Sequence, residues 1–102
     1  VARVKVAAAP GVEKIQTIGV CAGSGESLLD EAIAEGCELF FTGEMRHHEV
    51  LSATARGCSI MLAGHTNTER GFLPILRDRL AEQLPEAEFI VSKSDCDPFE
   101  AM

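Results

Sequence analysis

Segment 63–72 places an imidazole, His65, and a carboxylate, Glu69, four positions apart between two small-residue breaks. Imidazole nitrogen and carboxylate oxygen both suit zinc, iron, manganese or magnesium, and positions four apart face the same way where the backbone turns helically. A structural zinc ion takes four protein ligands, and a catalytic one typically takes three with a water molecule. His65 and Glu69 are therefore candidate ligands of a divalent ion whose remaining ligands come from elsewhere.

The same residues also fit a structural interpretation. In a capping box, Thr66 would accept from a backbone N–H three residues on, and Glu69 would reach back to the N–H of Thr66. Pro74 suits the first turn of a helix and costs about 3 kcal/mol in an interior, so we expect the regular helix to start near residue 71 or 72. Residues 66–70 would then form a turn that leaves Glu69 available to a metal. Residue types alone leave capping and ligation equally open.

Composition bounds the classes of function. The chain has 102 residues, 46% of them hydrophobic, which predicts one packed domain. Its net charge of -7 and its dispersed Lys and Arg residues argue against nucleic acid or an anionic membrane as the main partner. No apolar run approaches the about 20 residues of a membrane span, so we expect a cytoplasmic protein. Because the chain begins with Val1, we also expect it to be a cleaved or partial form of something longer.

The four cysteines show no metal-binding or redox spacing. They are scattered through the chain and include no C-x-x-C pair: Cys21, Cys37, Cys58 and Cys96. Without a secretory signal, scattered cysteines are expected to be free thiols. Cys21 and Cys58 fall in apolar, strand-like runs, so we predict that they behave as small buried hydrophobic residues.

Hydrophobic periodicity and glycine breaks predict alternating strands and helices. The expected strands are residues 15–21, 39–42, 58–63 and 89–91, and the expected helices are 27–36, 45–56 and a third from residue 71 or 72 to 84. This alternation predicts a single α/β domain over residues 1–102, with a mainly parallel sheet covered by helices. In the tail, residues 95–99 resemble a turn that packs Phe99 back on the body.

Polar or glycine-rich segments follow three of the predicted strands. Because ligands collect at the carboxyl ends of strands in open α/β sheets, we expect these segments to converge. Gly23-Ser24-Gly25 could offer backbone N–H groups to an anion, although a tight strand-to-helix turn is the more frequent reason for such glycines. Glu44 and His48 are candidates for an acid, a base or a residue that orients a ligand, although a solvated or capping histidine is the more frequent role of a residue such as His48.

Taken together, these segments resemble the C-terminal half of the NIF-three-like family, often labelled type 2 GTP cyclohydrolase I. The resemblance runs from about Ile15 to Phe99 and rests on four segments: residues 21–25, 42–49, 64–72 and 94–99. It implies a two-lobed α/β protein that assembles into ring-shaped homohexamers and holds a dinuclear metal centre between its lobes.

The resemblance also implies roles for individual residues. His65 and Glu69 match the family's C-terminal metal ligands, which favours ligation over capping. The other ligands, a His-His pair and an Asp, belong to an N-terminal half that this chain lacks, and His47-His48 is not that pair. We therefore expect an incomplete site that binds divalent ions weakly in this chain alone, and a tendency to self-associate or to pair with the missing lobe.

The implied chemistry is metal-assisted hydrolysis of a small or anionic substrate, including the opening of a purine imidazole ring. Nothing in these residues selects GTP. One alternative is a binding or assembly module of a homo-oligomer without catalysis. Another is a nucleotide-binding α/β domain that uses Gly23-Ser24-Gly25, although a longer phosphate-binding fingerprint is missing.

Overall fold

A four-stranded sheet lies at the centre of the computed structural model, which describes residues 3–100. The strand order is β1-β4-β3-β2, where β1 is Lys5–Ala7, β2 is Ile18–Ser24, β3 is Leu39–Glu44 and β4 is Ser59–Leu62. Strands β2, β3 and β4 are parallel, whereas β1 is antiparallel to β4. The predicted α/β class with a mainly parallel sheet is confirmed.

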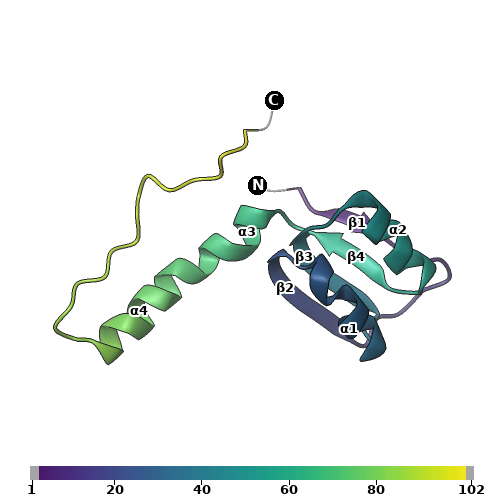
Figure 1. The fold of residues 1–102 in the computed structure, drawn as a ribbon, viewed down its shortest axis with the longest axis horizontal. Helices are drawn as coiled ribbons and strands as arrows, with labels where there is room; N and C mark the ends of the chain where they lie inside the picture. The colour runs from purple at the N-terminus through teal and green to yellow at the C-terminus, as the bar shows by residue number, and fades with distance from the viewer. Residues whose placement is uncertain (1–2, 101–102) are drawn as a thin grey trace.

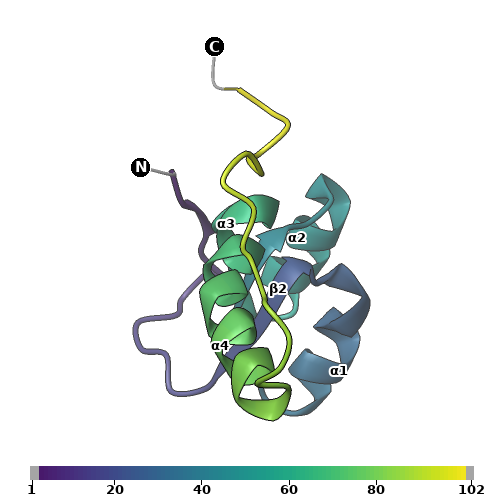
Figure 2. The ribbon, with the colours of Figure 1, turned by 90° about the vertical axis from the view of Figure 1, so that its left-hand side faces the viewer.

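The helices follow the strands as the alternation predicts (Figure 1). They are η1 (Glu26–Leu28), α1 (Leu29–Ala34), α2 (His47–Ala55), α3 (His65–Glu69), η2 (Arg70–Phe72) and α4 (Leu73–Gln83). Helix α1 connects β2 to β3, and α2 connects β3 to β4. Since both crossovers step across the sheet in the same direction, their common handedness places both helices on one face (Figure 2). None of the described helices is long and apolar enough to cross a membrane.

The core lies between this face and the two helices. Its buried residues come from both layers and are at most 8% exposed: Leu29, Cys37, Phe40, Ala53, Cys58 and Ile60. On the edge strand β2, the side chains of the other face remain open, with Ile18 56% and Val20 74% exposed. Helices α1 and α2 therefore leave this part of the other face uncovered.

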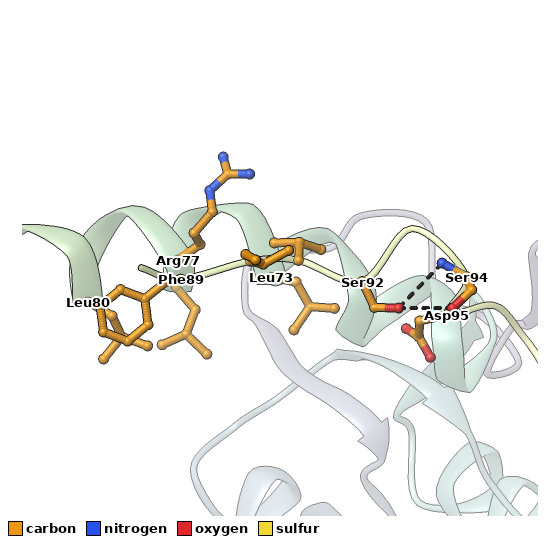
Figure 3. Close-up of a pocket in the computed structure, with 10 residues that line it drawn as sticks. Leu73, Arg77, Leu80, Phe89, Ser92, Ser94 and Asp95 are labelled. Carbon is orange, nitrogen blue, oxygen red and sulfur yellow. Dashed lines mark hydrogen bonds between the residues drawn. The ribbon is translucent and has the colours of Figure 1, made fainter. Parts of the chain in front are cut away.

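Helix α4 projects away from the sheet, and the tail runs back beside it (Figures 1 and 2). Leu73 and Leu80 of α4 lie with Phe89 of the tail around a hollow of about 530 Å³ (Figure 3). The predicted strand 89–91 is wrong, because none of these residues forms a strand. The neighbouring element is helix α4, whose backbone N–H and C=O groups bond to one another. The apolar segment 89–91 therefore lies beside leucine side chains and has no strand to pair with.

Two further expectations need correction. Phe99 does not pack on the body, because it is 85% exposed, although its backbone N–H donates to Oδ1 of Asp97 at 2.9 Å.

Segment 66–70 is not a simple turn: α3 begins at His65, directly after Gly64. Gly64 has φ 98°, which allows the chain to leave β4 and turn into a helix at once. Pro74 lies in the first turn of α4, as predicted.

Candidate metal centre

The ends of β2, β3 and β4 are tied together at one edge of the sheet. The Thr42 hydroxyl donates to the carbonyl of Gly23 at 3.1 Å, and the N–H of Gly64 donates to the carbonyl of Gly43 at 2.8 Å. The N–H of Gly23 donates in turn to the hydroxyl of Thr68 in α3 at 2.9 Å. The three glycine-containing segments therefore converge, as the strand order requires.

His65 and Glu69 face each other at this edge. Nε2 of His65 lies 3.0 Å from Oε1 of Glu69, and Nδ1 of His65 lies 2.7 Å from Oε1 of Glu44. The side chains of His65 and Glu69 are 46% and 41% exposed, so solvent reaches both. The residue that precedes α3 is Gly64, and no side chain caps the helix. The capping box is therefore absent, and the Glu69 carboxylate is turned toward the imidazole.

The surroundings of Gly23, near the end of β2, require a glycine. It has φ 71°, and a Cβ on it would lie 2.9 Å from Oε2 of Glu69 and 3.2 Å from Nε2 of His65. Any side chain would therefore enter the space between the backbone and the candidate ligands. Gly43 is equally constrained, because its Cβ would lie 2.6 Å from the carbonyl oxygen of Gly23. Both glycines let the ends of β2, β3 and β4 approach closely.

The pKa of His65 is raised above its ordinary value of 6.5. The hydrogen bond to Glu44 is the largest cause, and burial is the main opposing effect. The negative charges of Glu69 and Glu44 raise the pKa further, against the positive charge of Arg70. Because the Glu44 carboxylate can only accept, it holds the proton of neutral His65 on Nδ1 and leaves the lone pair on Nε2. A carboxylate-oriented histidine of this kind is the usual arrangement of a metal-binding imidazole.

The donor pair fits a divalent ion as part of a shell. A separation of 3.0 Å between Nε2 and the carboxylate oxygen is what two ligands about 2.1 Å from a common ion can have. Within residues 3–100, no group of three or more His, Cys, Asp or Glu side chains is arranged to hold a metal. A metal ion held by His65 and Glu69 would therefore need further ligands.

The C-terminal tail borders the site. A hollow of about 420 Å³ is lined by Glu44, His65 and Glu69 and by tail residues Asp97 and Phe99. Nε of Arg70 lies 2.6 Å from Oδ2 of Asp95, which fixes the tail beside α3. The sequence indicated a turn here but gave no reason to place Asp97 at the site, because no spacing rule connects it to a helix some thirty positions earlier.

His48, Ser24 and Gly25 make no hydrogen bond or ion pair with His65 in the described chain. His48 is 68% exposed, and its nearest charged neighbour is Glu49, with Nε2 3.7 Å from Oε1. Ser24 lines a different hollow, beside Glu26 and Arg46. Residues 23–25 were predicted to offer backbone N–H groups to an anion. The N–H of Gly23 donates to the hydroxyl of Thr68 instead. The roles of His48, Ser24 and Gly25 stay predictions.

Comparison with known proteins decides the family. The sequence profile of the family Duf34/NIF3 (NGG1p interacting factor 3) matches residues 1–98. The chain belongs to this family. Protein NIF3 homolog of Schizosaccharomyces pombe is 42% identical over 105 residues, covering 97% of this chain and 37% of the relative. NIF3-like protein 1 of Bos taurus is 46% identical over 85 residues, covering 82% of this chain and 22% of the relative.

Solved structures support the same assignment of the fold. A Bacillus cereus protein related to NIF3 has a TM-score of 0.81 at 23% identity, covering 98% of this chain and 28% of the other chain. The protein ybgI, described as of unknown function, has a TM-score of 0.69 at 32% identity, covering 85% of this chain and 34% of the other. This NIF3-family chain therefore spans between 22% and 37% of these relatives' length.

Proposed function

We propose that this NIF3-family chain supplies part of a dinuclear divalent-metal site, with His65 and Glu69 as ligands. The observation that carries the proposal is the placement of Nε2 of His65 3.0 Å from Glu69 while Glu44 holds Nδ1 at 2.7 Å. Glu44 thus acts as an orienting residue, and we assign it this role in preference to acid or base catalysis. Zinc, iron, manganese and magnesium all accept this pair of donors.

The chain's own residues prepare the site in three ways. Glu44 sets the tautomer and ring orientation of His65, and Gly23 leaves room for the carboxylate of Glu69. Arg70 lies 3.7 Å from Glu69 and fixes the tail through Asp95, so that the hollow beside the ligands is bordered but open. A metal pair bound here would supply water of lowered pKa as a nucleophile, the chemistry of a hydrolase or cyclohydrolase.

The remaining ligands would come from parts of the family protein outside this chain. The chain covers 37% of the fission-yeast relative, so the longer protein has ample room for a second lobe. We therefore propose that the isolated chain binds metal weakly and that the complete protein, as a homo-oligomer, retains it.

A second candidate function is a binding or assembly module without catalysis. It is favoured by the uncovered face of the sheet, where Ile18 and Val20 are 56% and 74% exposed. Exposed apolar side chains on a sheet face favour association with another surface. Metal retention with measurable turnover in the complete protein would exclude this candidate, and metal retention without turnover would support it.

The proposal is tested by metal content. The complete protein, purified without chelator, is compared with His65→Asn, Glu69→Gln and the control His48→Asn by elemental analysis. We expect the wild type and His48→Asn to retain the metal and the two ligand variants to lose most of it. Equal metal content in all four proteins would rule out His65 and Glu69 as ligands.

A further inference from the structure

A second hollow borders His65 and contains two cationic residues. Its volume is about 370 Å³, and Arg3, Lys5, Glu44, Met45 and His65 are among the residues that line it. The tail residues that border the first hollow do not line this one. His65 and Glu44 therefore lie between a space next to the tail and a space next to the N-terminal segment.

The direction of β1 brings these cations to the site. Because β1 is antiparallel to β4, Lys5 at its start pairs with Leu62 at the end of β4. His65 follows Leu62 by three positions, at the same edge of the sheet. Arg3 precedes Lys5 by two positions, the spacing at which side chains of an extended chain project to the same side. A parallel β1 would have carried both cations to the opposite edge.

Neither cation forms an ion pair with a carboxylate in the described chain, although Glu44, whose carboxylate is paired with His65, lines the same hollow. Four arginines form ion pairs within 4.0 Å of an acidic side chain: Arg46, Arg56, Arg70 and Arg77. Arg3 and Lys5 form no such pair among residues 3–100, although the chain contains 16 acidic residues. Two unpaired positive charges at one hollow of an acidic protein attract an anion to that place.

We propose that Arg3 and Lys5 form an anion subsite for a small-molecule substrate that carries a phosphate group, with the reacting part of the substrate at His65 and Glu69. The assignment of the reacting part depends on the proposed metal-dependent function. Two positive charges match the about -1.5 to -2 charge of a phosphomonoester at neutral pH. Arginine binds phosphate oxygens through its planar fork, and lysine acts as a compact point charge.

Phosphate binding to the metal-free protein tests the subsite without the metal. The complete protein is treated with chelator and titrated with inorganic phosphate, and binding is followed by NMR chemical shifts. The double variant Arg3→Gln/Lys5→Gln is compared with Lys14→Gln/Lys93→Gln, which removes the same number of charges from exposed positions outside this hollow. We expect the first variant to bind phosphate about tenfold more weakly and the second to bind like the wild type.

The other outcomes are equally informative. Equal phosphate affinity in both double variants, or no phosphate binding by the wild type, would overturn the subsite and leave Lys5 as a charged residue that protects an edge strand. The metal content of Arg3→Gln/Lys5→Gln is expected to equal that of the wild type. If the wild type retains no metal, the proposed metal function is wrong. The phosphate titration of the metal-free protein still tests the anion subsite on its own.

Discussion

Nδ1 of His65 lies 2.7 Å from Oε1 of Glu44, although the two residues are 21 positions apart in the sequence. Glu44 is the last residue of β3, and His65 begins the helix that follows β4. Parallel pairing of β3 with β4, with Thr42 opposite Leu62, brings the two strand ends together. The sheet thereby presents a histidine whose ring is already oriented, helix α3 adds Glu69, and the end of β2 adds the backbone of Gly23.

Replacing Glu44 by Gln should lower the pKa of His65. The hydrogen bond to Glu44 is the largest cause of the raised pKa, and glutamine keeps an acceptor but not the charge. A histidine whose pKa is higher in the folded protein than in the unfolded chain stabilises the fold. This contribution is fully present below pH 6.5, and it is lost as the pH rises through the pKa of the folded state. NMR titration of the His65 ring in metal-free protein measures the shift, with Glu88→Gln as control. An unchanged pKa in Glu44→Gln would contradict the assigned hydrogen bond.

Gly23→Ala should weaken metal binding by about tenfold, an effect typical of disturbed contacts around a metal ligand. The added Cβ would lie 2.9 Å from Oε2 of Glu69. Gly57→Ala is the matched control, because Gly57 also has positive φ, 85°, but nothing within 4 Å of its Cβ position. Both variants should lose about 1 kcal/mol or more of stability from backbone strain. Metal titration of both proteins separates the effects, and equal affinities would show that Gly23 has no role at the site.

Ile60→Ala should destabilise the fold by about 2–5 kcal/mol, the usual cost of truncating a buried isoleucine. Ile60 is 1% exposed and pairs with Phe40 on one side and Ala7 on the other. Ile90→Ala removes the same atoms from a residue that is 77% exposed, so it should change stability by less than about 0.5 kcal/mol. Urea unfolding measures both changes. A similar loss in the two variants would mean that the tail segment is buried in the folded protein.

The thiols should differ sharply in reactivity. Burial is the main reason that the pKa of Cys58 is raised to about 11, whereas Cys96 is exposed. Since the thiolate is the reactive form, iodoacetamide at pH 8 should label Cys96 rapidly and Cys58 only after unfolding. Mass spectrometry of the labelled peptides gives the order of reaction. Rapid labelling of Cys58 in the native protein would show that the core between the sheet and helix α2 opens readily.

Sequence patterns predicted the elements that have long periods or clear breaks. Strands β2, β3 and β4 were expected because apolar runs end at glycines, and the buried position of Cys58 followed from its place in such a run. Cys21 is only partly buried, because its strand lies at the edge of the sheet. Strand β1 was missed because three residues carry too short a pattern to be recognised.

In the candidate site, only the contact between residues close in the sequence could be predicted. His65 and Glu69 are four positions apart, so local spacing brings them together in a helical turn. The pairing of His65 with Glu44, the approach of Gly23 and the position of Arg3 and Lys5 depend on strand register. Register is set by packing between distant segments, and a single sequence does not display it.

The most direct test of the central claim is the position of the metal itself. Crystals of the complete, metal-loaded protein, measured at the absorption edge of the bound metal, give an anomalous difference map that locates it. We expect a peak within about 2.3 Å of both Nε2 of His65 and a carboxylate oxygen of Glu69, with Glu44 still on Nδ1. A peak coordinated by His47 or His48, with His65 and Glu69 bonded only to each other, would contradict the account.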